Sequence, residues 1–318
     1  MLRILAALLL FAAIPAWPQA WPAKPVKIIV PFAPGGSADT LGRLVAQKLS
    51  EQLKASFVVE NRAGAGGSLG SELVSSAVPD GYTLVVSGIA SHVIAPALPQ
   101  GTPYDPLRDF THIALFGGPP AVLAVNPSVK AKDLREFVLL AKSKPGALSY
   151  GSPGNGTQGQ LVAELFKQRA GIDMVHVPHK GASAAVSDLI AGHLPAVSTT
   201  LTTAAPQIRA GKARGLAISA ASRLAEFPEI PTFAEMGYPD LVATVWFSLS
   251  GPANMPTDIV EKLNAEVNRA LELPDVRERL KPEGIIPSRL GARDFGAFVA
   301  DEVKRWAPIV KASGAKND

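Results

Sequence analysis

The sequence contains no cysteine, which excludes disulfide bonds, thiol catalysis and thiolate metal sites. It also lacks a basic stripe, because lysine and arginine form no block of five or six residues and the net charge is only +4. Proteins that bind nucleic acid or a membrane surface usually present such a stripe. We therefore expect no nucleic-acid partner.

Histidine is scarce, with five residues in the chain, and the motif H-E-x-x-H is absent. No acidic residue lies at metal-ligand spacing from His176, His179 or His193, so we predict no metal site. His92 differs because it follows an apolar strand-like run at residues 83–88. Open α/β sheets bind ligands at the carboxyl ends of their strands. We expect either a ligand contact for His92 or an exposed loop position.

Long apolar runs are missing after residue 20, where no segment reaches 18 apolar residues, and this predicts a soluble mature protein. At the N-terminus, Arg3 precedes an apolar run at residues 4–14, which is too short to span a bilayer but typical of a signal-peptide core. We predict a signal peptide over residues 1–20 and a periplasmic location, although Pro18 is unusual so close to a cleavage site. The alternative is an uncleaved N-terminal anchor.

The whole sequence has 47% hydrophobic and 18% charged residues, which is typical of a folded globular protein. After residue 20 the chain alternates between strand and helix patterns. Its length suffices for two domains. The pattern predicts strands at residues 26–30, 56–60, 83–88, 121–125, 148–152, 174–177, 195–200, 213–219 and 245–250. The intervening helices favour an α/β fold with mainly parallel sheets.

A glycine–proline turn at residues 117–120 separates two such units, and the chain ends in two long helical patterns. We predict two α/β lobes around a ligand cleft, joined by crossings near residues 117–122 and 241–249. Residues 21–120 and 243–318 would form lobe 1, and residues 121–242 would form lobe 2. The C-terminal helices would pack back on lobe 1.

Residues 31–39 (PFAPGGSAD) lie where a predicted strand ends and a helix begins. Gly35 and Gly36 allow a tight turn and a close approach of backbone to ligand. The N–H groups at a helix start stabilise a carboxylate or phosphate. The alternative is an ordinary turn in which Ser37 caps the helix.

Residues 150–160 (YGSPGNGTQGQ) repeat this pattern in the second unit and contain G-x-G-x-x-G. A dinucleotide site also requires an acidic residue at the end of the next strand. That strand ends in Val177 and Pro178, and Asp173 lies at its other end, so we predict no dinucleotide cofactor. Neither glycine turn contains arginine or lysine, so its hydrogen-bond donors are neutral, and Lys180 is the nearest cation.

Residues 66–70 match G-x-S-x-G, the nucleophile turn of α/β-hydrolases. In those enzymes the serine directly follows a strand, whereas several loop residues separate Ser68 from the predicted strand at residues 56–60. The spacing favours a helix cap at Ser68. A periplasmic hydrolase remains an alternative function.

Several stretches resemble the Bug family, the substrate-binding proteins of tripartite tricarboxylate transporters. They are VPFAPGGSAD, VENRAGAGGSLG, PDGYTL, YDPLRDF, HVPHKGASAA, PQIRAGKARGLAIS and IPTFAEMGYP, in order from about residue 25 to residue 240. The resemblance implies a type II periplasmic binding-protein fold. It also implies a small carboxylate ligand and, as partner, the membrane permease subunits of such a transporter. We expect no cofactor, no catalysis and a monomer.

By this resemblance and by the two glycine turns, we predict a ligand site formed by Pro34, Gly35, Gly36, Ser37, Asp39, Ser152, Gly154, Asn155, Gly156 and Thr157. We add His92 because of its position after a predicted strand. The family often has histidine at the position of Gln160 and tyrosine at the position of His179. These departures leave the particular carboxylate open. A ligand-presenting component of a signalling system is the alternative to transport.

Overall fold

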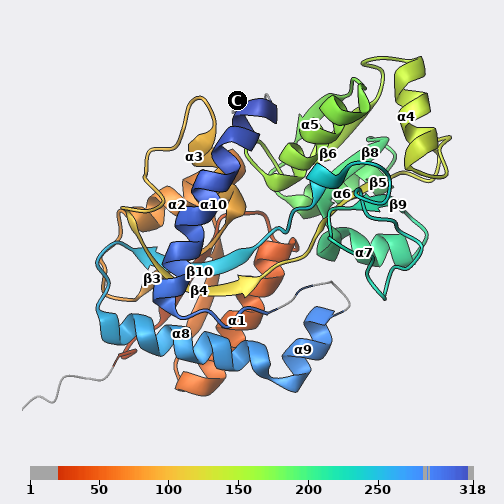
Figure 1. Cartoon of the computed structure of the whole chain (residues 1–318). Helices are drawn as coiled ribbons and strands as arrows, with labels where there is room; N and C mark the ends of the chain where they lie inside the picture. Colours follow the sequence, from red (N-terminus) through yellow and green to blue (C-terminus); the bar gives the residue numbers. More distant parts are fainter. Residues whose placement is uncertain (1–20, 282–284, 286, 314–318) are drawn as a thin grey trace, which may run out of the picture.

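A computed structural model of the chain describes residues 21–281, 285 and 287–313. The predicted signal peptide lies outside these residues. Two five-stranded sheets divide the described chain into two lobes (Figure 1). None of the helices in the described part of the chain has an apolar stretch long enough to cross a bilayer.

Lobe 1 is formed by the sheet with strand order β2-β1-β3-β10-β4 and its covering helices. Its strands are β1 (Val26–Val30), β2 (Phe57–Asn61), β3 (Thr83–Gly88), β4 (Phe110–Gly117) and β10 (Phe247–Pro252). Its helices are α1 (Ser37–Leu53), η1 (Ala65–Gly67), α2 (Ser68–Ser75), η2 (Ala90–Ile94), α3 (Ala95–Ala97), α8 (Thr257–Glu272), α9 (Pro274–Leu280) and α10 (Ala292–Ser313).

Lobe 2 is formed by the sheet with strand order β7-β6-β8-β5-β9. Its strands are β5 (Ala121–Val125), β6 (Ser149–Ser152), β7 (Val175–Pro178), β8 (Ala196–Thr200) and β9 (Arg214–Ile218). Its helices are α4 (Leu134–Ser143), α5 (Gln158–Ala170), α6 (Ala182–Ile190) and α7 (Leu201–Arg209), and η3 (Pro239–Leu241) follows on the way back to lobe 1.

Apolar periodicity explains why these segments take their structures. In α8, Ile259, Leu263, Val267 and Leu271 recur every four residues and are buried, so one face of the helix packs on α1 and β4. All five residues of β5 are buried, as expected for a strand covered on both faces. The two-lobe α/β fold is therefore as predicted.

The expectation of mainly parallel sheets holds for strand direction, because in each sheet four strands run one way and only one, β10 or β5, runs the other way. In each sheet two strand pairings are parallel and two are antiparallel. The antiparallel pairings all involve β10 or β5, the strands that the chain enters after crossing between lobes. We also did not predict β4, which is held in the sheet by β10, a strand far away in the sequence.

The two crossings run side by side at the hinge. The N–H group of Val245 donates to the carbonyl oxygen of Pro119 at 2.9 Å, and Pro120 forms an antiparallel bridge with Thr244. A side chain at Gly118 would collide with the carbonyl oxygen of Val245 at 1.6 Å. The lobe boundaries predicted after residues 120 and 242 lie within these two connections. The exact boundary residues remain predictions.

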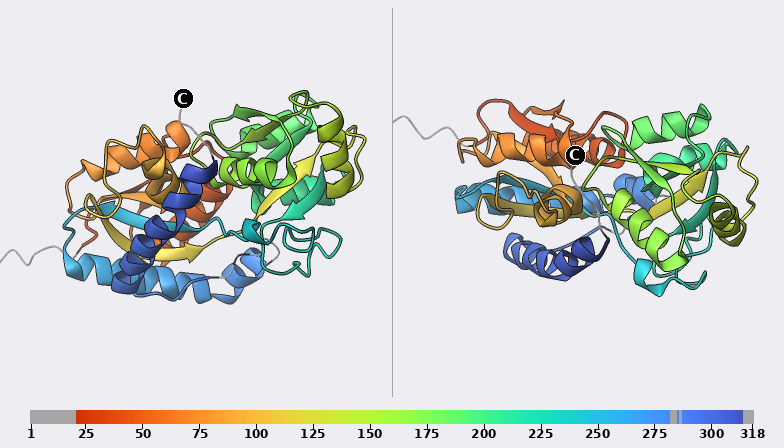
Figure 2. Two further views of the ribbon diagram at one scale, coloured as in Figure 1. Left: turned by 45° about the horizontal axis from the view of Figure 1, so that its top comes forward. Right: turned by 90° about the horizontal axis from the view of Figure 1, so that it is seen from above.

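Helix α10 lies along lobe 1 and reaches lobe 2, as two views of the ribbon show (Figures 1 and 2). It packs on β4 and η2 and also contacts α5 of lobe 2. Its Glu302 accepts hydrogen bonds from the indole nitrogens of Trp246 at 2.9 Å and Trp306 at 3.0 Å. The C-terminal helices thus pack on lobe 1, and Trp246 ties α10 to the returning crossing.

Candidate functional site

Four helices begin at one small cavity between the lobes. Helix α1 comes from lobe 1, and α5, α6 and α7 come from lobe 2. Residues from all four starts line the cavity, whose volume is about 40 Å³. They are Gly36, Ser37, Ala38, Thr157, Gln158, Gly159, Ala182 and Thr200. The first N–H groups of a helix have no acceptor within the helix and carry partial positive charge. This inner cavity is therefore suited to an anion.

Three hydroxyl groups meet beside these helix starts and join the lobes. Ser37 Oγ lies 2.5 Å from Thr200 Oγ1 and 3.2 Å from Thr203 Oγ1. The two threonine hydroxyls are 3.1 Å apart. Each hydroxyl can donate one hydrogen bond and accept others. The inner cavity can thus offer an anion neutral O–H donors in addition to backbone N–H groups.

The remaining wall of the inner cavity is apolar. It consists of Phe32, Ala90, Pro153, Val245 and Phe247. Val245 belongs to the crossing that returns to lobe 1, and Phe247 is the first residue of β10, so the end of the hinge forms the back of the cavity. An apolar wall beside oriented donors favours a small molecule with a carbon skeleton and a charged end.

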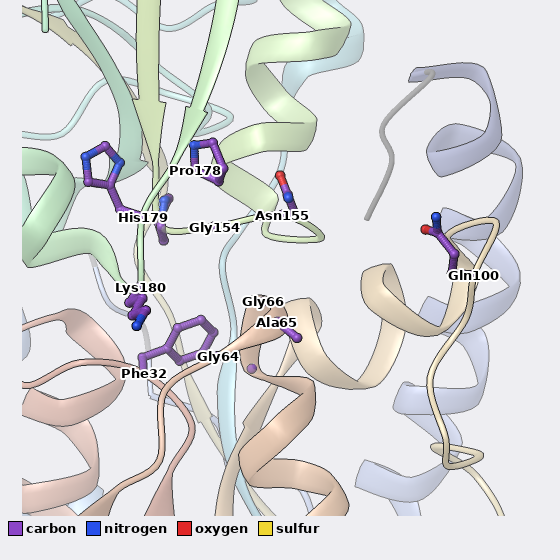
Figure 3. A pocket seen from close by; sticks show the side chains of 12 residues that line it. Phe32, Gly64, Ala65, Gly66, Gln100, Gly154, Asn155, Pro178, His179 and Lys180 are labelled. Carbon is purple, nitrogen blue, oxygen red and sulfur yellow. The ribbon is translucent and has the colours of Figure 1, made fainter. Parts of the chain in front are cut away.

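A larger outer pocket of about 480 Å³ lies at the mouth of the cleft (Figure 3). Its lobe 1 side includes Phe32 and residues 64–67, and its lobe 2 side includes Gly154, Asn155 and Lys180. Phe32 and Pro153 line both the inner cavity and the outer pocket. These two residues therefore stand between the two spaces, one from each lobe.

The lobes touch at several further points around the cleft. The N–H group of Ala33 donates to the carbonyl oxygen of Lys180 at 3.0 Å, and Ser183 Oγ donates to the carbonyl oxygen of Pro34 at 2.8 Å. Gly66 has a φ of 62°, and a Cβ there would lie 1.9 Å from the carbonyl oxygen of Asn155. These contacts describe a closed cleft.

Asp39 does not line either space but shapes the first glycine turn. Its carboxylate accepts hydrogen bonds from the N–H group of Gly35, from Arg43 and from Asn61 at 2.8–3.0 Å. Burial raises the pKa of Asp39, and these hydrogen bonds outweigh burial, so its pKa lies below the usual value. The ionised carboxylate thus fixes the turn that presents Gly36 and Ser37.

The second glycine turn is fixed in a similar way by its own side chains. Thr157 caps α5, since Thr157 Oγ1 donates to the carbonyl oxygen of Gly154 at 2.6 Å and accepts from the N–H group of Gln160 at 3.5 Å. Ser152 is buried and donates to the same carbonyl oxygen at 3.1 Å. The hydroxyl proton of Thr157 is therefore used within the turn, whereas Ser152 Oγ also lies 2.6 Å from His176 Nε2, which can accept its proton instead.

The structure separates His92 from the other predicted site residues. Its side chain is fully buried in lobe 1, where its ring packs against those of Phe110, Tyr104 and His112. It lines neither the inner cavity nor the outer pocket. Residue His92 sits in η2, a turn of π-helix that the sequence pattern did not reveal. His92 is therefore not part of the candidate site. Its burial also contradicts the alternative expectation of an exposed loop position.

Gln160 and His179, the two residues that depart from the family pattern, both make hydrogen bonds within lobe 2. Gln160 Oε1 accepts a hydrogen bond from the N–H group of Gly156 at 2.8 Å, which supports the second glycine turn. His179 lines the outer pocket, and its two ring nitrogens lie 3.1 Å from the carbonyl oxygen of Val177 and 2.9 Å from the carboxylate of Asp188. Gln160 thus supports the turn, whereas the ring of His179 is turned into lobe 2, where Asp188 holds it (Figure 3).

Sequence reasoning missed the contributions of α6 and α7. Ala182 and Thr200 line the inner cavity, although we proposed anion sites only at the two glycine turns. Both glycine turns were proposed as anion sites because a helix begins soon after a strand. The same reasoning would have predicted the starts of α6 after β7 and of α7 after β8 as further sites. The expected cap at Ser68 and the alternative of a cap at Ser37 are both wrong, because Gly67 and Gly36 occupy the N-cap positions of α2 and α1.

Metal ligands do not gather in the described part of the chain. No group of three or more histidine, aspartate or glutamate side chains there could hold an ion. The hydroxyl and backbone donors of the inner cavity suit an anion instead.

Comparison with known proteins agrees with the motifs and the fold. Residues 41–315 match the tripartite tricarboxylate transporter family receptor. Protein BugT of Bordetella pertussis (strain Tohama I) is 36% identical over 99% of both chains. A solved periplasmic transporter is 39% identical, with a TM-score of 0.90 over 93% of this chain and 99% of its own.

MatC from Rhodopseudomonas palustris, solved with bound malate, is also similar. It is 34% identical, with a TM-score of 0.87 over 91% of this chain and 99% of its own. The family match covers most of the chain, and the resemblance found in the sequence motifs is confirmed. The chain belongs to the tripartite tricarboxylate transporter family of receptors, the Bug-type solute-binding proteins.

Proposed function

We propose that this protein binds a small organic acid in the cleft between its lobes and delivers the acid to the permease of a tripartite tricarboxylate transporter. The carboxylate lies in the inner cavity, and the rest of the molecule extends toward the outer pocket past Phe32 and Pro153. Candidate acids are di- and tricarboxylates, acidic amino acids and aromatic carboxylates. The malate bound to MatC supports a carboxylate as ligand.

The observation that carries this proposal is the meeting of four helix starts from two lobes at one cavity. The donors there are backbone N–H groups and the hydroxyls of Ser37 and Thr200. Binding at these donors stabilises the closed cleft, because only the closed arrangement brings α1 to face α5, α6 and α7. Of the residues predicted from the sequence, Gly36, Ser37 and Thr157 line this cavity, and Gly154 and Asn155 line the outer pocket.

A screen of ligands by thermal unfolding tests the proposal. A ligand at about 1,000 times its Kd adds about 4 kcal/mol to the free energy of unfolding. For a protein of this size, this corresponds to about 8 °C in melting temperature. We expect clear shifts with some organic acids and none with sugars or cationic amines. A sugar as the strongest ligand would contradict the carboxylate site.

We further propose that the protein acts without catalysis, as a monomer in the periplasm. The family match and the periplasmic transporter among its structural neighbours support a periplasmic binding protein without catalysis. N-terminal sequencing of the periplasmic form should begin near Trp21, and sedimentation should give one chain per particle. Release of an alcohol or amine from incubated esters and amides would instead support the hydrolase alternative. Loss of acid uptake on deletion of the gene supports transport, whereas intact uptake with loss of a transcriptional response supports signalling.

A further inference from the structure

The side chain of Gln158 is buried without a hydrogen-bond partner at the inner cavity. It is the first residue of α5, is 1% exposed and lines the cavity. Both its amide nitrogen and its amide oxygen are shielded from solvent, and neither has a partner among the described residues. A buried amide normally satisfies both groups, because an unsatisfied donor or acceptor loses its hydration without compensation.

A buried amide without hydrogen-bond partners is not a general feature of the start of α5, as neighbouring Gln160 shows. Gln160 is also buried, but its amide oxygen accepts from the N–H group of Gly156 at 2.8 Å, and its amide nitrogen lies 3.3 Å from His176 Nδ1. Both residues belong to the first turn of α5. Of these two glutamines, Gln158 alone combines a place in the cavity wall with two unused hydrogen-bonding atoms.

We propose that Gln158 is a specificity-determining residue that selects acids with a neutral group able both to donate and to accept a hydrogen bond, namely a hydroxyl or a carboxamide. This inference rests on the proposed function, in which the helix starts and the hydroxyls of Ser37 and Thr200 hold the carboxylate. A hydroxyl or carboxamide elsewhere on the ligand donates to Gln158 Oε1 and accepts from Gln158 Nε2.

A second ionised carboxylate at this place would be a poorer partner. It has no proton to donate, so Gln158 Oε1 would stay unsatisfied and would face a negatively charged oxygen. A hydrocarbon group would leave both amide atoms unsatisfied. Sites built to hydrogen-bond a substrate hydroxyl discriminate strongly against the analogue without it, because the polar groups of the protein are then buried unpaired.

Calorimetry on matched acids tests the inference. The pairs are three to six carbons long and differ in one group, for example malate with succinate, and succinamate with the monomethyl ester of succinate. In the pair that binds most tightly, we expect the wild-type protein to prefer the acid with the hydroxyl or carboxamide at least tenfold. Gln158→Met, which keeps the length but removes the amide, should abolish this preference and still bind the partner acid.

The stability of the ligand-free protein supplies a second readout. Gln158→Met should leave the melting temperature unchanged or raise it, because no hydrogen bond is lost. The control Gln160→Met should lower it by about 2–6 °C, because the N–H group of Gly156 loses its acceptor. A decrease in Gln158→Met as large as in the control would overturn the inference, and so would a preference that the variant retains.

Failure of this inference can be distinguished from failure of the proposed function. If acids bind but the wild type shows no preference within the pairs, the role of Gln158 is wrong and the carboxylate site stands. If no acid in the panel binds to the wild type, the proposed function is wrong and the inference falls with it.

Discussion

Ser37 Oγ and Thr200 Oγ1 lie 2.5 Å apart and connect the two lobes directly at the inner cavity. Ser37 is the first residue of α1, and Thr200 is the N-cap residue of α7. Both residues line the inner cavity. In the proposed function, the same hydroxyls that connect the lobes are the donors to the anion.

Ser37→Ala is expected to weaken binding of the best organic acid by about tenfold or more, because hydrogen bonds to charged groups contribute roughly 1.5–3 kcal/mol. The melting temperature of the ligand-free protein should also fall by about 2–6 °C, because Thr200 Oγ1 loses a buried hydrogen-bond partner. Calorimetry measures the affinity. The control is Ser143→Ala on α4, where the exposed hydroxyl donates only to the carbonyl oxygen of Leu140. Equal losses of affinity in both variants would contradict the site.

Gly36→Val is expected to prevent tight binding while leaving each lobe folded. A Cβ at Gly36 would lie 3.7 Å from Ala182 Cβ across the cleft, which is ordinary contact, and the backbone at Gly36 has a φ of −87°. The two methyl groups of valine then fill the cavity and hold the lobes apart. Affinity should fall at least tenfold by calorimetry. In the control Gly296→Val, the new Cβ meets nothing within 4 Å, and affinity should be unchanged.

Glu302→Ala is expected to lower the free energy of unfolding by about 2–4 kcal/mol, because two buried indole N–H groups lose a charged acceptor. Denaturant titration measures this change. Asp301→Ala removes the neighbouring exposed carboxylate and should stay within about 0.5 kcal/mol of wild type. A similar effect of both substitutions would mean that Glu302 does not anchor α10 to Trp246.

Stability is expected to fall as the pH decreases from about 6.5 toward 4. Burial lowers the pKa of His112 to about 4, against a hydrogen bond to the carbonyl oxygen of Pro106, and burial with the adjacent His112 also lowers the pKa of His92. The unfolded chain therefore takes up protons in this range before the folded protein does. Each such histidine changes the free energy of unfolding by at most about 1.4 kcal/mol per pH unit in this range. Above pH 6.5 it adds no pH dependence, because it is then neutral in both the folded and the unfolded chain.

The variant His112→Gln should show a smaller decrease of stability between pH 6.5 and pH 5 than the wild type, as measured by urea unfolding. His193→Gln is the control, because that side chain is 72% exposed. An unchanged slope in His112→Gln would show that the buried ring does not control this pH dependence.

The sequence by itself determined the elements whose apolar pattern is strong. Strands at residues 83–88 and 121–125 were predicted to the residue, and the buried face of α8 was predicted from four apolar positions. The motifs also determined the family and, through it, the two-lobe fold. Local sequence is sufficient here because periodicity reports directly which side chains are buried.

Only the tertiary structure decided which elements meet. Periodicity shows that a strand is buried but not which strand pairs with it, so the antiparallel neighbours of β10 and β5 were missed. The same limit explains the burial of His92 and the contact between Ser37 and Thr200, which are separated by 163 positions. The inner cavity is formed by four helix starts from distant parts of the chain, and closure of the lobes brings them together.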